Sequence, residues 1–240
     1  MTWTVDGVNR QAIVIPPSGG EKGAKSPVIF FFHGHGGRMN GPAQKMNFPS
    51  LWPEAVVVYP QGLPTPSKRD PNGTRPGWQT EAGSQGDRDL KFFDAMLESL
   101  RKKYSIDDSR IYVTGFSNGA GFSYLLWSER SKNLAGIGIC AGRLSPSELP
   151  SKGLPVFVLA GQSDSILPFS LQQESIEAVK KANNVSGIGQ SCGVNCTLYP
   201  SAKQTPVMTV IHPGAHVCPP WATSGMVSFF KGQSTASAKK

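Results

Sequence analysis

Residues 111–120 of this 240-residue chain read I-Y-V-T-G-F-S-N-G-A, and this stretch decides the fold. Its apolar first part is typical of a buried strand, and the residues from Ala120 to Arg130 are typical of a helix. Between them lies the pattern G-x-S-x-G, with Ser117 at its centre. A serine on a sharp turn needs neighbours without Cβ atoms, because the helix must pack back against the strand. The strand, turn and helix together predict a nucleophile elbow, which presents a reactive serine.

Strands and helices alternate through the rest of the chain. The continuous apolar run at 27–32 indicates a strand that is buried on both faces. Residues 87–104 carry an apolar stripe at three- and four-residue spacing, which predicts the clearest helix. We also expect strands at 2–5, 12–15, 55–59, 111–115, 137–140, 155–160 and 207–211, and helices at 118–130, 171–182 and 221–230. This alternation predicts an α/β fold, with a mainly parallel central sheet and helices on both of its faces.

The domain organisation follows from length and composition. We find no linker between two cores, so we expect a single catalytic domain over residues 1–231 and a flexible tail over 232–240. Residues 60–86 form a long loop that is dense in Pro, Gly, Asn and Asp, and such loops are usually functional or mobile. Residues 39–49 are expected to be loop with at most a turn of helix.

The formal net charge of +8 can be interpreted in several ways. The basic residues are scattered, with clusters at 101–103 and 239–240 among them. A nucleic-acid footprint should form one patch or stripe, so we expect a solvated basic surface and no nucleic-acid partner. A further reading is attraction towards acidic polymers such as uronic-acid polysaccharides. No run of 18 apolar residues is present, so we expect no membrane-spanning helix.

The four cysteines are Cys140, Cys192, Cys196 and Cys218. The short spacing between Cys192 and Cys196 predicts a small disulfide loop, because the segment offers too few further ligands for zinc. Cys140 ends an apolar run and is expected to be a buried small residue. The partner of Cys218 stays open, since four cysteines allow three full pairings.

A serine nucleophile needs a base within hydrogen-bond reach and an acid that orients the base. The chain has four histidines. His33 and His35 lie in a glycine-rich turn that suits an oxyanion loop better. His212 ends a strand and is expected to be held against the sheet. His216 lies in a loop that can reach over the strand ends, so we expect it to be the base, with His212 as the alternative.

Position in the sequence narrows the choice of the acid that orients the base. The carboxylates after Ser117 are Glu129, Glu148, Asp164, Glu174 and Glu177. Among them Asp164 follows the C-terminal end of a buried strand, where catalytic loops gather in open α/β sheets. The alternative is that Asp164 only forms a local turn with its serine neighbours. The order Ser117, Asp164, His216 is the order found in the α/β-hydrolase fold.

The transition state of an acyl transfer also needs fixed N–H donors for its oxyanion. We expect one donor from the backbone of Asn118, at the start of the elbow helix, where the helix dipole also helps. The second is expected from the backbone of His35, with Gly36 as the alternative. The stretch H-G-H-G-G at 33–37 could instead be only a tight turn. We expect no metal site there, because no acidic ligand lies nearby, and no cofactor.

Taken together, these motifs resemble the polyhydroxybutyrate depolymerase and feruloyl esterase family of α/β-hydrolases, which also includes acetyl xylan esterases. The matching pieces, which cover nearly the whole chain in order, are H-G-H-G-G at 33–37, V-V-V-Y-P-Q-G at 56–62, R-P-G-W-Q at 75–79, F-F-D-A-M-L at 92–97, I-Y-V-T-G-F-S-N-G-A at 111–120, G-Q-S-D at 161–164 and G-A-H at 214–216. The resemblance implies a serine esterase with Ser117, Asp164 and His216 as its triad.

The resemblance also carries expectations about substrate and compartment. Similar proteins are mostly secreted, so we expect a secreted, disulfide-bonded protein whose signal peptide is absent from this sequence, with a cytoplasmic protein as the alternative. The histidine loop departs from its relatives, because it reads G-A-H-V-C-P-P-W at 214–221 where they often read G-G-H-x-W-P. Trp221 therefore falls later in this chain.

The expected activity is that of a feruloyl (hydroxycinnamoyl) esterase acting on aryl esters of plant cell-wall polysaccharide. Trp78 and Trp221 are expected to form flat aromatic walls of the acyl pocket, with ordinary core tryptophans as the alternative. Gln79 is expected to hydrogen-bond the substrate. The alternatives are a polyhydroxybutyrate or other polyester depolymerase, an acetyl xylan esterase, or a non-catalytic binding protein on the same scaffold. The oligomeric state stays open.

Overall fold

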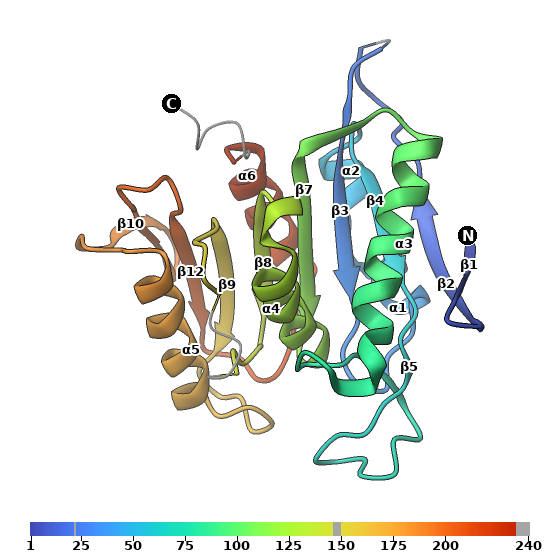
Figure 1. Cartoon of the computed structure of the whole chain (residues 1–240). Coiled ribbons are helices and arrows are strands. Elements are labelled where there is room, and N and C mark those ends of the chain that lie inside the picture. Colours follow the sequence, from blue (N-terminus) through green and yellow to red (C-terminus); the bar gives the residue numbers. More distant parts are fainter. Residues whose placement is uncertain (22, 146–149, 234–240) are drawn as a thin grey trace.

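A computed structural model describes residues 1–21, 23–145 and 150–233 (Figure 1). Its central feature is one sheet of ten strands. The strands are β1 (Thr2–Val5), β2 (Val8–Ile15), β3 (Ser26–Phe32), β4 (Val56–Pro60), β7 (Ile106–Phe116), β8 (Gly136–Cys140), β9 (Val156–Gly161), β10 (Gln190–Gly193), β11 (Cys196–Tyr199) and β12 (Val207–His212). Their order across the sheet is β1-β2-β4-β3-β7-β8-β9-β12-β11-β10.

The centre of the sheet is parallel and both edges are antiparallel. Strands β4, β3, β7, β8, β9 and β12 run in one direction, so their C-terminal ends meet at one edge. The hairpin β1–β2 closes one side and the hairpin β10–β11 closes the other. The β1–β2 turn has positive φ at both Asp6 (49°) and Gly7 (77°), as a tight two-residue hairpin requires.

Helices cover both faces of the sheet, as the alternation of elements predicts. The helices are α1 (Asn40–Lys45), α2 (Phe48–Leu51), α3 (Arg88–Lys103), α4 (Asn118–Arg130), α5 (Phe169–Ala182) and α6 (Ala222–Lys231). Figure 1 shows α3, α4 and α5 on the near face and α1, α2 and α6 behind the sheet. The expected α/β-hydrolase fold with a mainly parallel sheet is therefore confirmed.

The central strand β3 shows why its sequence is apolar throughout. Phe30 and Phe32 belong to the core cluster under α3 and α4, while Phe31 belongs to the cluster on the opposite face, where its ring lies 6.0 Å from that of Phe48. Successive side chains of a strand point to opposite faces, and both faces of this sheet are covered. A run of phenylalanines is thus buried on two sides at once.

The structure also contains elements that the sequence patterns did not predict. Helices α1 and α2 occupy the stretch expected to be loop with at most one turn, and the β10–β11 hairpin contains the cysteine loop. Strand β7 begins at Ile106 and β2 at Val8, earlier than expected. The long loop contains the small ribbon β5 (Leu63–Pro64) and β6 (Pro76–Gly77).

The predicted flexible tail falls mostly on residues 234–240, which lie outside the described residues. Its first two residues continue from α6 by hydrogen bonds. Gly232 N–H donates to Phe229 O over 3.2 Å, and Gln233 N–H donates to Phe230 O over 2.9 Å. The carbonyl of Gln233 also accepts a bond from the Tyr112 hydroxyl. Within the described ranges, no helix has the length and apolarity needed to cross a membrane.

Candidate active site

Ser117 lies on a strained turn between β7 and α4. Its φ of 55° and ψ of −116° are rarely adopted by a residue with a side chain. The flanking glycines make this turn possible. A Cβ at Gly119 would overlap the carbonyl oxygen of Phe32 and lie 2.6 Å from that of His33. A Cβ at Gly115 would overlap the carbonyl oxygen of Gly119. The backbone contacts expected of a nucleophile elbow are therefore present.

Three side chains from separate parts of the chain meet at this turn. Ser117 Oγ lies 2.8 Å from His216 Nε2, and His216 Nδ1 lies 2.6 Å from Asp164 Oδ2. Asp164 comes from the loop after β9, and His216 from the loop after β12. Ser117 follows β7, and β7, β9 and β12 run parallel in one sheet, so their C-terminal ends bring the serine, the acid and the imidazole to the same edge.

The carboxylate of Asp164 is buried and held by several donors. Its Oδ1 accepts bonds from the N–H groups of Ile166 (2.9 Å) and Leu167 (2.8 Å), and its Oδ2 accepts a bond from Gln172 Nε2 (3.0 Å). Burial alone raises the pKa of a carboxyl, but the two backbone N–H bonds and the interaction with His216 outweigh it, so the pKa of Asp164 lies below its ordinary value. The group is therefore ionised at neutral pH and fixed in orientation.

The other candidate base is placed differently. His212 is buried, its Nδ1 accepts a bond from Gly214 N–H (3.1 Å), and its ring packs edge-on against Trp221. Burial lowers the pKa of His212 below its ordinary value, so the ring stays neutral. The structure thus holds His212 at the sheet and brings His216 to Ser117, the arrangement expected from the loop positions.

The histidine-glycine turn after β3 forms one wall of the site. His33 is buried, and its Nε2 accepts a bond from Gly62 N–H (3.0 Å). Burial lowers the pKa of His33, so it is a neutral structural group. His35 Nε2 lies 3.2 Å from Asp70 Oδ2, which ties the turn to the long loop.

Two backbone N–H groups at the site are free to bind an oxyanion. In the described part of the chain, no acceptor receives a hydrogen bond from the N–H of His35 or of Asn118. The alternative donor, Gly36 N–H, already donates to Pro76 O over 2.7 Å. His35 and Asn118 also both line the cleft that contains Ser117. The geometry therefore favours His35 over Gly36 as the second donor.

The R-P-G-W-Q segment supports the site through its backbone rather than through the Trp78 ring. Asn118 Oδ1 accepts a bond from Trp78 N–H (2.7 Å), and Asn118 Nδ2 donates to Trp78 O (2.9 Å). The indole is 1% exposed, stacks on Phe122 and donates to His33 O over 2.9 Å. This corrects the expectation that Trp78 walls the acyl pocket, because its ring lies in the core. No sequence pattern indicated this role of the Asn118 side chain.

Gln79 and Trp221 are not brought to the cleft either. Gln79 is buried, its Nε2 donates to Asp87 Oδ1 (2.9 Å), and its Oε1 accepts from Asp89 N–H (3.0 Å), so its amide organises the start of α3. Trp221 is 55% exposed, and its ring packs against His212 outside the lining of the cleft. The substrate contacts expected for these two residues are corrected accordingly.

Both cysteine pairs form disulfides. The predicted Cys192–Cys196 loop is confirmed at the β10–β11 hairpin. Cys140 is buried as expected, but the prediction of a simple small residue is wrong, because Cys140 is bonded to Cys218. The carbonyl of Cys140 accepts a bond from Ser117 N–H (2.9 Å), and Cys218 lies two residues after His216. This disulfide therefore joins the end of β8, which contacts the turn at Ser117, to the loop that contains His216.

Ser117 lines a cleft with a volume of about 890 Å³. The buried Tyr124 and Ala141 and the partly exposed Phe116 line it beside the serine. A second hollow of about 370 Å³ shares Gly34, His35, Phe116 and His216 with the lining of the cleft. Within the described ranges, no three His, Cys, Asp or Glu side chains lie together as a potential metal site. The cleft is large enough for an organic ester of drug-like size.

Comparison with known proteins shows that this chain is similar to esterases. A probable feruloyl esterase C of Aspergillus terreus is 24% identical over 254 residues, which cover 97% of this chain and 88% of that protein. A probable feruloyl esterase C of Aspergillus flavus is 30% identical over 67% of this chain and 57% of its own length. A bifunctional acetylxylan esterase/xylanase of Neocallimastix patriciarum is 26% identical over 68% of this chain and 22% of its own length. The chain thus spans little more than half of the second relative and about a fifth of the third.

Solved structures share the fold at low sequence identity. An acetyl xylan esterase from Aspergillus awamori superposes with a TM-score of 0.73 at 13% identity, covering 96% of this chain and 98% of that one. A ferulic acid esterase from Anaeromyces mucronatus, solved in complex with ferulic acid, superposes with a TM-score of 0.67 at 17% identity, covering 97% and 89%. The family model for phospholipases and carboxylesterases matches residues 12–194. The chain therefore belongs to the phospholipase/carboxylesterase family of α/β-hydrolases.

Proposed function

We propose that this protein is a serine carboxylic-ester hydrolase in which Ser117 is the nucleophile, His216 the base and Asp164 the orienting acid. The observation that carries the proposal is the hydrogen-bonded row of the three side chains, with 2.8 Å between Ser117 and His216 and 2.6 Å between His216 and Asp164. Ser117 and His216 line the cleft. Membership of a carboxylesterase family supports the same reaction class.

The geometry suggests the steps of the reaction. Ser117 Oγ attacks the ester carbonyl while His216 Nε2 removes its proton, and the protonated ring then delivers that proton to the leaving alkoxide. Asp164 keeps the other ring nitrogen protonated and stabilises the imidazolium. A water molecule activated by His216 then hydrolyses the acyl-enzyme and restores Ser117.

The developing negative charge on the substrate oxygen is assigned to the N–H groups of His35 and Asn118. Both donors are held in place before substrate arrives, since Asn118 is fixed to Trp78 by two bonds and His35 to Asp70 by its ring. Removal of one such donor typically costs about 3 kcal/mol of transition-state stabilisation. The start of α4 adds the favourable end of a helix dipole.

The substrate class that we propose is a feruloyl or related aryl ester of plant cell-wall polysaccharide. The support is the similarity to proteins named feruloyl esterase and a cleft lined by the partly exposed Phe116, which offers aromatic surface to an aryl group. An acetyl ester of xylan is the second candidate, favoured by the similarity to the bifunctional acetylxylan esterase/xylanase. Polyester remains the third substrate class to assay.

An ester panel tests the proposal, with Ser117→Ala as the blank. Methyl ferulate, acetylated xylan, 4-nitrophenyl acetate and polyhydroxybutyrate film are assayed with both proteins. Turnover of methyl ferulate that disappears in Ser117→Ala is the expected result. Turnover of methyl ferulate at the level of the blank would remove the feruloyl assignment. Equal rates for wild type and Ser117→Ala on every ester would favour a non-catalytic binding protein on this scaffold.

We also propose that the protein works in an oxidising compartment outside the cell. Its two disulfides support this, since disulfides form and persist in secreted proteins and are rare in the cytosol. Thiol titration of protein purified without reductant gives the test. No reactive thiols are expected before unfolding in reductant, whereas four thiols in native protein would contradict the proposal.

A further inference from the structure

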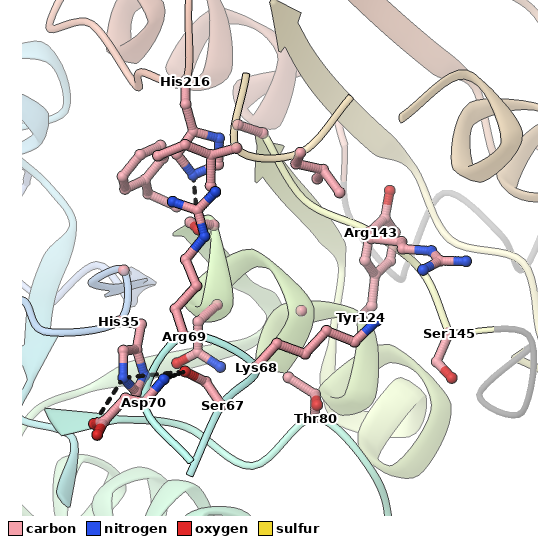
Figure 2. A pocket seen from close by; sticks show the side chains of 18 of the residues that line it. His35, Ser67, Lys68, Arg69, Asp70, Thr80, Tyr124, Arg143, Ser145 and His216 are labelled. Atoms are coloured by element: carbon pink, nitrogen blue, oxygen red, sulfur yellow. Dashed lines mark hydrogen bonds and ion pairs between the residues drawn. The ribbon is translucent and has the colours of Figure 1, made fainter. Parts of the chain in front are cut away.

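Four exposed basic side chains line the cleft beside Ser117: Lys68, Arg69, Arg75 and Arg143. We refer to these four residues as the cationic rim. In Figure 2, Lys68 and Arg69 extend across the cleft from the long loop, Arg69 in the direction of His216 and Lys68 in the direction of Tyr124. Tyr124 and Ala141 are buried and form the inner wall, so the cations lie at the outer part of the site.

The nearest carboxylate in the loop is already engaged. Asp70 Oδ2 accepts bonds from Arg75 N–H (2.8 Å) and from the His35 ring (3.2 Å), and Asp70 Oδ1 accepts one from the Thr74 hydroxyl (3.1 Å). Asp70 therefore serves to hold the loop against the histidine-glycine turn. Glu81 is the other acidic group of the lining, which leaves cations in excess over carboxylates there.

The cationic rim is set apart by its place in the cleft beside Ser117. Elsewhere on the surface some exposed basic residues form ion pairs, as Lys91 does with Asp6 (2.6 Å), and others, such as Lys181, form none within the described residues. No residue of the cationic rim forms an ion pair in the described part of the chain. A cleft lined by one sign of charge focuses the electric field and raises the local concentration of an oppositely charged substrate.

We infer that the cationic rim binds a carboxylate carried by the alcohol portion of the ester, as in a uronic-acid unit of the esterified polysaccharide. This rests on the proposed ester hydrolysis and names the substrate class of the same site. The acyl group occupies the inner part of the cleft next to Tyr124, and the polymer lies across the exposed Lys68 and Arg69. Guanidinium groups suit this role, because their planar donors match the two oxygens of a carboxylate.

Two matched acetyl esters test the inference. In 4-acetoxybenzoate the leaving alcohol carries a carboxylate, and in methyl 4-acetoxybenzoate the same position is neutral. Each kcat/KM is divided by the rate constant for hydroxide-catalysed hydrolysis of the same ester, which removes intrinsic reactivity. At about 0.02 M salt we expect the anionic ester to be favoured by about tenfold, and at about 0.5 M salt by far less, since exposed charges are screened.

Variants locate the effect within the cleft. Lys68→Gln/Arg69→Gln is expected to bring the ratio of anionic to neutral kcat/KM close to one at low salt. The matched control is Lys181→Gln/Lys203→Gln, which removes two exposed charges that do not line the cleft and should retain the wild-type ratio. Equal loss of the ratio in both double variants would assign the effect to net charge and overturn the inference.

Two further substrates separate the sources of the carboxylate. Mono-4-nitrophenyl adipate carries a carboxylate on the acyl side, and its methyl ester is the neutral match. Acetylated glucuronoxylan carries carboxylates on the polymer, and the same polymer with its carboxyl groups reduced is the neutral match. The expected result is slower release of acetate from the reduced polymer and no preference between the adipates. A preference confined to the adipates, or equal rates on the two benzoates, would overturn the inference while leaving ester hydrolysis intact. Failure of the wild type to hydrolyse any of these esters would instead overturn the proposed function.

Discussion

The Cys140–Cys218 disulfide offers a sharp test of how the site is held together. It joins the end of β8, whose carbonyl accepts the Ser117 N–H, to the loop that carries His216. We predict that Cys140→Ala/Cys218→Ala loses both stability and rate. The histidine loop then has one fewer attachment to the sheet, so His216 spends less time within reach of Ser117.

The size of the effect follows from the length of chain that the disulfide closes. Its two cysteines are 78 residues apart, and the loss of loop-closure entropy predicts about 4.5 kcal/mol of stabilisation. Cys192 and Cys196 are only 4 residues apart, which predicts about 2 kcal/mol. For the rate, misplacement of a catalytic group by about 1 Å can cost about a hundredfold, which bounds the expected fall in kcat.

The Cys192→Ala/Cys196→Ala variant is the matched control, because that disulfide lies in the hairpin at the outer edge of the sheet. Urea unfolding gives the two stabilities, and kcat on a small neutral ester gives the two rates. We expect the control to keep its kcat and lose less stability. Equal losses of stability in both variants, or wild-type kcat in Cys140→Ala/Cys218→Ala, would show that the disulfide does not hold the histidine loop in place.

Three further changes test other parts of the site. Gly119→Ala should lower the free energy of unfolding in urea by about 3 kcal/mol, because the new Cβ overlaps backbone atoms. Gly41→Ala is the control, since no atom lies within 4 Å of a Cβ at that position, and it should not destabilise the protein. Equal stabilities of the two variants would contradict the packing described for the elbow. Asp164→Asn should lower kcat by about 10⁴-fold in steady-state assays with little change in folding, as the equivalent change does in a serine protease. A fall of less than tenfold would argue against Asp164 as the acid that orients His216. Burial lowers the pKa of His212 and His33, so the unfolded chain takes up protons below about pH 6.5 that the folded chain does not. The free energy of unfolding should therefore fall as the pH drops from 7 towards about 5, and His212→Gln should flatten that dependence by at most about 1.4 kcal/mol per pH unit; an unchanged slope would contradict it.

Much of the framework could be predicted because it depends on local patterns. Strand β3 is buried on both faces, so its sequence is a continuous apolar run. Helix α3 is buried on one face, so its apolar residues recur at helical spacing, and both patterns can be detected in the sequence. The elbow could be predicted because Gly115 and Gly119 meet backbone atoms within a few residues of Ser117 or on the neighbouring strand. Parallel strands then bring the residues that follow them to one edge.

The errors involve contacts that no local pattern records. Trp78 sits in a polar loop, and only the packing of its ring under Phe32 and Phe122 distinguishes a core tryptophan from a pocket wall. The pairing of Cys140 with Cys218 depends on how the histidine loop folds back over β8. The β10–β11 hairpin is exposed or half-buried throughout, so it has no apolar alternation to detect.

Covalent labelling of Ser117 tests the central claim most directly. The protein is incubated with diethyl 4-nitrophenyl phosphate, and the site of modification is located by mass spectrometry of its tryptic peptides. We expect one diethylphosphoryl group per chain, on Ser117 within the peptide that follows Arg110, and no labelling of His216→Ala on the same timescale. An unlabelled protein, or a label on any other residue, would contradict the assignment of Ser117 as the nucleophile.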